Sequence, residues 1–140
     1  MIQQTHKRIT VLLDMDGTIA DLYGIENWLP RLRNSDENIF LECAPMVTQE
    51  VLFETFPQDK FEIKIKSMTP LGATVEYCEN VIKQKTQWLK KYFPKIENMA
   101  FLEYGEDKKE KGSRTMYLVD DSEKIRTNFD GVALNPKNLW

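Results

Sequence analysis

Two aspartates separated by one residue stand directly behind an apolar run near the N-terminus. The run Ile9–Leu13 (ITVLL) is continuous and rich in β-branched residues, which predicts a strand buried on both faces. The chain continues as Asp14-Met15-Asp16-Gly17-Thr18. Ligands of open α/β sheets bind at the carboxyl ends of strands, so a site is expected here. Thr18 would offer such a site a hydroxyl and an N–H near a helix start. The structural alternative is an acidic turn that caps a helix.

A second acidic pair, Asp120-Asp121, follows the apolar run Tyr117–Val119. The strands of a parallel sheet share one direction, so both acidic clusters would lie at the same edge. Carboxylates that converge repel one another unless a cation separates them, and oxygen ligands alone favour magnesium. The sequence therefore predicts a Mg²⁺ site from Asp14, Asp16, Asp120 and Asp121, although a helix N-cap is the alternative for the second pair alone.

Hydroxyl groups and lysines supply candidate phosphate contacts. Ser67-Met68-Thr69-Pro70 follows an alternating run, and its hydroxyl and N–H groups could hold a phosphate oxygen; a plain Ser/Thr-Pro turn is the alternative. Lys85 and Lys108 could neutralise phosphate charge, or could simply be solvated. The predicted phosphate-binding residues are Ser67, Thr69, Lys85 and Lys108. Between the two hydroxyls we favour Ser67, which directly ends the strand.

Five apolar runs and two helical patterns form the framework that must position these residues. Strands are predicted at Ile9–Leu13, Phe61–Ser67, Met99–Tyr104, Met116–Val119 and Val132–Leu134. Helices are predicted at Thr74–Phe93, which Pro94 ends, and at Ser122–Phe129, with Ser122 as N-cap. Strands that alternate with helices predict an α/β fold with a mainly parallel sheet.

The segment Leu22–Gln58 interrupts this alternation as a helical insertion after the first strand. It contains three short helical patterns, broken around Pro30, Asn34–Asp36 and Pro45. Some of its apolar side chains could stack on a nucleobase or simply pack onto the body: Trp28, Leu29, Leu32, Phe40 and Phe53. The very polar stretch Gly105–Arg114 predicts a solvated loop.

Composition excludes several classes of protein. The chain has 140 residues, the size of one globular domain, so we expect a single domain over residues 1–140. Lys and Arg total 19 against 22 Asp and Glu, which argues against stable nucleic-acid binding. No apolar run approaches the ~18 residues of a membrane span, and no signal peptide is recognisable. Cys43 and Cys78 have no CxxC spacing, so we expect a cytoplasmic protein with neither a disulfide framework nor a zinc site.

The motif DMDGTIAD at Asp14–Asp21 resembles DxDGTxxD, the first motif of the haloacid-dehalogenase (HAD)-like hydrolase superfamily. A Ser or Thr after the second strand, a Lys and a late acidic pair follow in that superfamily's order. Lys85–Leu89, Tyr104–Lys108 and Leu118–Asp121 are similar to motifs of its 5′(3′)-deoxyribonucleotidase branch. The resemblance covers most of Ile9–Pro136, but only loosely the insertion.

The resemblance implies a Mg²⁺-dependent phosphate-monoester hydrolase that acts through an aspartyl-phosphate. Asp14 would be the nucleophile and Asp16 the general acid and base. Magnesium would be held by Asp14, the backbone carbonyl of Asp16, and Asp120 or Asp121. The implied architecture is a Rossmann-like three-layer sandwich with a five-stranded sheet and a small helical cap over residues 22–58. The implied substrate is a small phosphorylated molecule, a nucleoside monophosphate, bound by a monomer or homodimer.

Three other functions stay open. The same chemistry could serve a sugar phosphate or a nucleic-acid 3′-phosphate. A phosphoacceptor signalling module also gathers Asp, Ser or Thr, Lys and magnesium at one sheet edge, but there the acidic pair precedes the phosphorylated Asp. A binding protein could keep the fold without catalysis.

Overall fold

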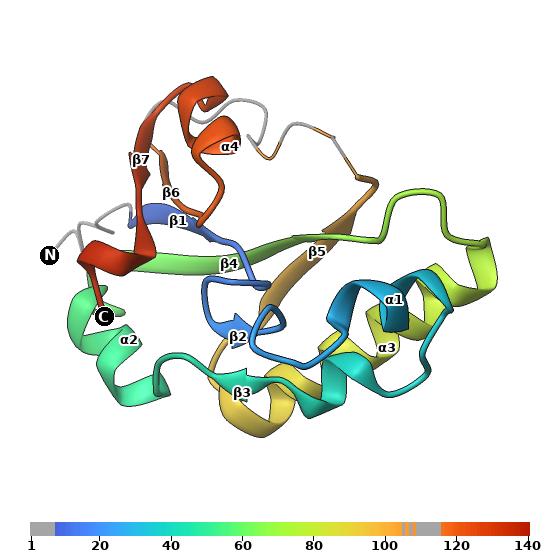
Figure 1. Cartoon of the computed structure of the whole chain (residues 1–140). Helices are drawn as coiled ribbons and strands as arrows, with labels where there is room; N and C mark the ends of the chain where they lie inside the picture. The colour runs from blue at the N-terminus through green and yellow to red at the C-terminus, as the bar shows by residue number, and fades with distance from the viewer. Residues whose placement is uncertain (1–7, 105, 107, 109–115) are drawn as a thin grey trace, which may run out of the picture.

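A parallel sheet forms the centre of the computed structural model, which describes residues 8–104, 106, 108 and 116–140 (Figure 1). The sheet has five strands in the order β5-β4-β1-β6-β7, and its neighbouring strands all pair in parallel. The strands are β1 (Ile9–Leu13), β4 (Phe61–Met68), β5 (Asn98–Leu102), β6 (Met116–Val119) and β7 (Val132–Leu134). The predicted α/β class with a mainly parallel five-stranded sheet is confirmed.

The strand boundaries follow the apolar runs closely. β1, β6 and β7 begin and end at the predicted residues, and β4 extends one residue further, to Met68. β5 ends at Leu102 rather than Tyr104 because the chain turns there: the Glu103 N–H donates to Glu106 Oε1 at 2.8 Å, and the Glu106 N–H donates back to Glu103 O. A residue whose backbone is used in a turn cannot continue the ladder of β4 and β5.

The central strand β1 is covered on both faces. Val11 and Leu13 belong to the larger hydrophobic core, whereas Leu12 packs with Met116 and Leu118 in a smaller one. Side chains alternate across a strand, so a strand covered on both sides needs apolar residues at consecutive positions. This requirement accounts for the unbroken apolar run that precedes the two aspartates.

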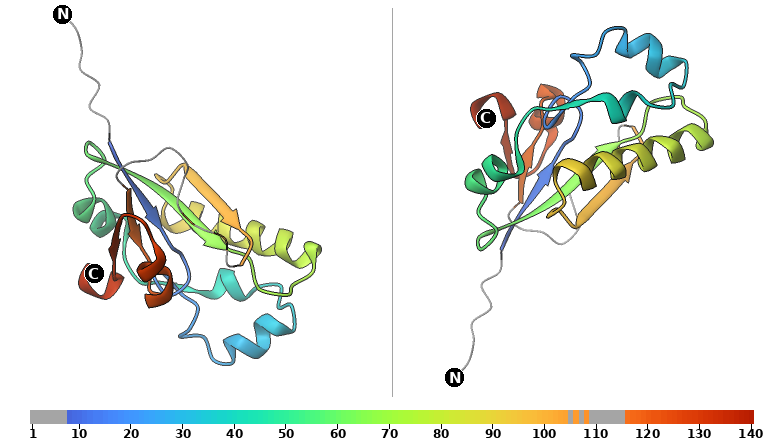
Figure 2. Two further views of the ribbon diagram at one scale, coloured as in Figure 1. Left: turned by 90° about the horizontal axis from the view of Figure 1, so that it is seen from above. Right: turned by 90° about the horizontal axis from the view of Figure 1, so that it is seen from below.

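Helices lie on both sides of the sheet. The long helix α3 (Val75–Tyr92) lies below the sheet in Figure 1, and the short helix α4 (Glu123–Asn128) lies above it. Figure 2 shows α3 running along the sheet face. Their N-caps are Thr74 and Ser122, whose hydroxyls accept from the third backbone N–H that follows each of them. Both helices confirm the sequence prediction, and the arrangement is consistent with a Rossmann-like fold.

Several short elements separate β1 from β4. They are β2 (Ala20–Asp21), α1 (Trp28–Arg33), the 3₁₀ helix η1 (Ile39–Glu42), β3 (Ala44–Pro45) and α2 (Gln49–Thr55). Pro30 lies inside the first turn of α1 instead of breaking a helix, because a first-turn N–H has no partner within the helix. β2 and β3 pair antiparallel. The sequence did not predict them, since strands of two residues carry no alternating pattern.

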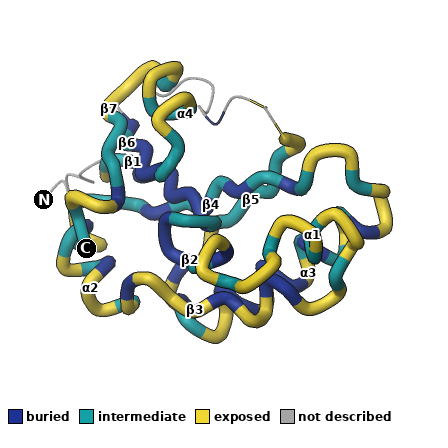
Figure 3. The backbone as a smooth tube through the Cα atoms, in the orientation of Figure 1, coloured by how far each residue is buried: buried dark blue, intermediate teal, exposed yellow. Residues whose placement is uncertain are grey.

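The helix α3 holds η1 against the body. Trp88 donates its indole N–H to the carbonyl of Cys43 at 2.8 Å, and Gln84 Oε1 accepts from the backbone N–H of Phe40 at 3.1 Å. Phe40 is buried in the larger core, whereas α1 contains no buried residue (Figure 3). The insertion is therefore anchored through η1, and α1 extends from it over the body.

No helix in the described part of the chain is both long enough and apolar enough to cross a bilayer. The predicted solvated loop Gly105–Arg114 falls mostly on residues outside the described ranges; of it the structure describes Glu106 and Lys108. The prediction for that loop therefore stays a prediction.

Replacing Trp88 with Phe should destabilise the fold by about 2 kcal/mol, because the Cys43 carbonyl loses a buried donor and the smaller ring leaves a void. Urea unfolding measures the change. Gln87→Ala, at an exposed position of the same helix, is the matched control and should stay within about 0.5 kcal/mol of the wild type. Equal midpoints for the two variants would contradict the anchoring role of Trp88.

The two cysteines should differ in reactivity. Burial raises the pKa of the Cys43 thiol to about 12, whereas Cys78 is half-buried. At pH 8 a thiol with that pKa is thiolate to the extent of about one part in ten thousand, and the thiolate is the reactive form. Mass spectrometry after brief iodoacetamide treatment should find Cys78 alkylated first, and both cysteines alkylated in urea. Equal rates in the folded protein would refute this assignment.

Candidate functional site

The carboxyl ends of the strands open into a cleft of about 800 Å³. Charged residues at the strand ends line one part of it: Asp14, Asp16, Lys108, Asp120 and Asp121. The insertion contributes Tyr23 and residues of α1, and the segment 68–74 contributes the remaining side. The cleft therefore joins the predicted acidic centre to the insertion after β1.

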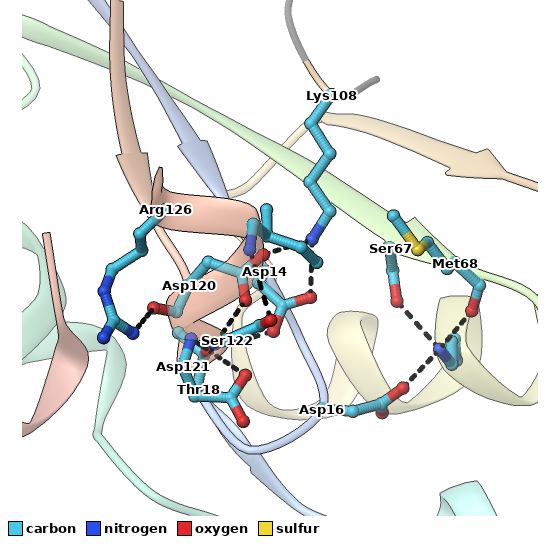
Figure 4. Close-up of polar contacts among 12 residues, drawn as sticks. Asp14, Asp16, Thr18, Ser67, Met68, Lys108, Asp120, Asp121, Ser122 and Arg126 are labelled. Carbon is cyan, nitrogen blue, oxygen red and sulfur yellow. Dashed lines mark hydrogen bonds and ion pairs between the residues drawn. The ribbon is translucent and has the colours of Figure 1, made fainter. Parts of the chain in front are cut away.

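Asp14 occupies the end of the central strand. Its backbone N–H donates to the carbonyl of Val119 at 2.9 Å, which ties it to the neighbouring strand β6. Its carboxylate accepts two hydrogen bonds, from Thr18 Oγ1 to Oδ2 at 3.0 Å and from Lys108 Nζ to Oδ1 at 2.9 Å. Both carboxylate oxygens are thus held in fixed directions at the cleft (Figure 4).

A tight turn follows Asp14 in place of a helix. The backbone N–H groups of Thr18, Ile19 and Ala20 all donate to the carbonyl of Met15. Gly17 has φ 79°, and a Cβ there would overlap the Asp121 carboxylate and the ring of Tyr23. The expectation that Thr18 lies near a helix start is wrong, since the turn leads into β2.

Thr18 joins the two acidic clusters. Its hydroxyl lies 3.0 Å from Asp14 Oδ2 and 3.3 Å from Asp121 Oδ1, and it accepts the Asp121 N–H at 3.2 Å. A hydroxyl has one hydrogen, so it donates to one carboxylate at a time. The Trp140 indole N–H donates to the Thr18 carbonyl at 3.1 Å. Nothing in the local sequence around Trp140 pointed to this contact.

Lys108 lies between Asp14 and Asp120. Its ammonium donates to Asp14 Oδ1 at 2.9 Å and to Asp120 Oδ2 at 2.6 Å. Burial by itself lowers the pKa of Lys108, but the two carboxylates outweigh burial and raise that pKa above its ordinary value. Asp120 Oδ1 accepts the Ser122 N–H at 2.9 Å, so both oxygens of Asp120 have a donor from the protein.

Asp121 is the carboxyl group that lacks such a counter-charge among the described residues. Burial, together with the hydrogen bond and charge of Asp14 and the charge of Asp120, raises its pKa to about 7. Carboxylate oxygens of Asp14, Asp120 and Asp121 lie within 4.8 Å of one another. The three residues form a compact set of oxygen donors, and the side chain of Asp16 lies outside it.

Asp16 pairs with the second lysine. Lys85 Nζ donates to Asp16 Oδ2 at 2.8 Å, while Asp16 Oδ1 is buried and has no hydrogen-bond partner within the described residues. Burial raises the pKa of Asp16, the Lys85 ammonium opposes that shift, and the Asp14 charge adds to it. Figure 4 shows Asp16 apart from Asp14 and Asp120, on the side of Ser67.

The four predicted phosphate contacts fall into two groups. Lys108 and Thr69 line the cleft, and the Thr69 hydroxyl donates to the carbonyl of Leu102 at 3.3 Å. Ser67 and Lys85 are both 0% exposed, and they contact each other at 2.8 Å between Oγ and Nζ. Ser67, Thr69 and the ammonium of Lys85 lie at the end of β4, whereas the ammonium of Lys108 lies at the ends of β1 and β6; only Lys108 and Thr69 line the cleft.

The apolar residues predicted to stack on a nucleobase also fall into two groups, those that line the cleft and one that does not. Trp28, Leu29, Leu32 and Phe40 line the cleft, whereas Phe53 packs against the larger core. Tyr23, which the sequence analysis did not select, lies edge-on to Trp28 with ring centroids 4.8 Å apart. Tyr23 is an aromatic residue close in sequence to Trp28 on the same insertion, and this proximity was the signal that could have identified it.

Neither the scan of protein-family models nor the search of curated proteins found a match to this chain. The fold and the site together define an α/β protein of Rossmann-like architecture. Its parallel strands end in a cleft lined by aspartates and by Lys108, which is paired with two of them.

Replacing Thr18 with Val keeps the side-chain volume but removes the hydroxyl between Asp14 and Asp121. Loss of these buried hydrogen bonds should lower the free energy of unfolding by about 1–3 kcal/mol in a buffer with EDTA. Thr18→Ser, which keeps the hydroxyl, is the matched control and should lose less than about 1 kcal/mol. If the two variants unfold at the same urea concentration, the hydroxyl does not hold the clusters together.

Proposed function

We propose that this chain hydrolyses phosphate monoesters, with Asp14 as the nucleophile and Mg²⁺ as the required cation. The observation that carries the proposal is the Asp14 carboxylate at the end of the central strand, facing the cleft beside Lys108 and the acidic pair. The DMDGTIAD motif, through its resemblance to HAD-like hydrolases, supports the same assignment.

The residues present fit a hard divalent cation. The set Asp14, Asp120 and Asp121 offers oxygen donors alone, within 4.8 Å of one another. With Asp14 and the backbone carbonyl of Asp16, one of Asp120 and Asp121 would hold the ion; Asp120 is paired with Lys108, whereas Asp121 has no lysine partner among the described residues. Magnesium bound there supplies positive charge that offsets the carboxylates and the substrate phosphate.

The chain's own groups account for each bond that changes. An oxygen of Asp14 attacks phosphorus, the bond from phosphorus to the ester oxygen breaks, and Asp16 gives its proton to the departing oxygen. Water then attacks the phosphorus of the aspartyl-phosphate and gives a proton to Asp16, which releases inorganic phosphate and restores Asp14. Lys108 contacts Asp14 and lines the cleft, so its ammonium can neutralise charge on the transferring group.

The insertion supports a substrate larger than phosphate alone. We propose that the segment 22–58 acts as a small cap, because Tyr23 and Trp28 line the same cleft as Asp14. A cleft of about 800 Å³ has room for a ring system, and aromatic edges favour a planar one. A nucleoside monophosphate meets both conditions and agrees with the branch that the motifs resemble.

Replacing Asp14 with Asn should abolish phosphate release, by at least about 1000-fold, because an amide cannot form the aspartyl-phosphate. Phosphate release is measured with nucleoside monophosphates, sugar phosphates and p-nitrophenyl phosphate. EDTA should remove the wild-type activity and added Mg²⁺ restore it. Asp59→Asn, at an exposed position outside the cleft, is the control and should keep full activity.

Other results of these assays would support a different function or substrate. Activity of Asp14→Asn near the wild-type level would refute the nucleophile. A stable acyl phosphate formed from a small phosphodonor, without turnover, would favour a phosphoacceptor module. Absence of both turnover and acyl phosphate would favour a binding protein, and a preference for sugar phosphates would correct the substrate alone.

A further inference from the structure

Lys85 carries a charge that has no access to the cleft. The side chain extends from α3 and is 0% exposed, and Lys85 is not among the residues that line the cleft. Its ammonium lies 4.7 Å from the centroid of the Phe40 ring, so the insertion covers it from one side. A substrate in the cleft therefore reaches Asp16, which lines it, but does not reach Lys85.

All the donors of this ammonium are already used. An ammonium has three N–H groups, and Lys85 Nζ lies 2.8 Å from Asp16 Oδ2, 2.8 Å from Ser67 Oγ and 3.0 Å from the Met68 carbonyl. Figure 4 shows the dashed lines from Asp16, Ser67 and Met68 converging on one point. Two of the acceptors belong to the end of β4, so the ammonium ties Asp16 to the rigid sheet. A phosphate could gain a bond from Lys85 only if one of these bonds broke.

The contact with Lys85 makes the two oxygens of Asp16 unequal. Oδ2 is held by the ammonium, whereas Oδ1 is buried and has no partner among the described residues. A buried oxygen without a hydrogen bond is costly. Oδ1 has almost no accessible surface, so the part of the Asp16 side chain that lines the cleft is not this oxygen.

We propose that Lys85 is a positioning residue that acts through Asp16: by holding Oδ2 it fixes the direction in which the Asp16 carboxyl group faces the cleft and the ester oxygen of the substrate. The inference rests on the proposed function. As an oxygen of Asp14 bonds to phosphorus, the bond to the ester oxygen breaks, its electron pair stays on that oxygen, and the proton comes from the carboxyl group of Asp16. The two lysines then have different roles: Lys108 contacts Asp14 and faces the cleft, whereas Lys85 orients Asp16.

Leaving groups of different basicity separate this role from phosphate binding. General acid catalysis contributes about 100-fold or more to esters of basic alcohols. Lys85→Met should therefore lower kcat for an alkyl phosphate about 100-fold, but less than about 5-fold for p-nitrophenyl phosphate, whose leaving group needs little protonation. Asp16→Asn should give the same split. An equal loss on both substrates would overturn the proposal.

A double variant tests whether Lys85 acts through Asp16. In an Asp16→Asn background the further change Lys85→Met should alter kcat for the alkyl phosphate less than about 2-fold, because the group that it positions is already gone. If the two losses multiply, Lys85 has an independent role and the proposal is wrong.

Phosphate affinity gives a readout that needs no turnover. Inorganic phosphate, titrated calorimetrically in the presence of Mg²⁺, should bind Lys85→Met within about 3-fold of the wild type and bind Lys108→Met at least about 10-fold more weakly. Weakening of Lys85→Met to the level of Lys108→Met would overturn the proposal. Lys90→Met, at an exposed position of α3, controls for loss of a charge on the same helix and should match the wild type in both assays.

The outcomes for the two proposals differ. If the wild type neither hydrolyses an ester nor binds phosphate, the proposed function fails and the role of Lys85 fails with it. If the wild type is active but Lys85→Met shows no leaving-group split, the role of Lys85 alone is refuted. Thermal unfolding confirms that each variant is folded; if Lys85→Met does not fold, Lys85→Gln is judged by the same criteria.

Discussion

Repulsion among carboxylates at one edge of the sheet is the constraint on which the rest of the site depends. Parallel pairing of β1 with β6 brings Asp14 and Asp120 to the same edge, and the turn after β1 adds Asp16. Charges so close together in a buried place are unfavourable without compensation. Lys108 pairs with the first two and Lys85 with the third. Burial still raises the pKa of Asp16, and burial with the neighbouring aspartates raises the pKa of Asp121 to about 7.

The two lysines occupy positions that stability alone explains poorly. Removing an ammonium from water costs several kcal/mol, and a buried ion pair often contributes little net stability compared with apolar packing. Both ammonium groups nevertheless sit beside carboxylates that line the cleft. Their ion pairs fix the directions of the Asp14 and Asp16 carboxylates, which is the arrangement that the proposed phosphate transfer would require.

Packing links the insertion after β1 to the charged groups of the cleft. Phe40 covers the ammonium of Lys85, and the Cys43 carbonyl is held by Trp88 on the same helix. Tyr23 and Trp28 then place aromatic edges along the cleft that Asp14 faces. One helix, α3, thus supports both the charged centre and the insertion whose aromatic side chains line the cleft.

The sequence by itself determined the elements and the strand-end aspartates. β1, β6 and β7, the N-cap of α4, and the placement of Asp14 and Asp120 behind apolar runs follow from local patterns, because burial on both faces and capping leave marks within a few residues. Only the tertiary structure decided that Lys85 pairs with Asp16, 69 residues away in sequence, and that Lys108 pairs with Asp14, 94 residues away. A lysine has one charge and a long flexible side chain, so its partner depends on which carboxylates the fold brings within reach and not on its neighbours in the chain.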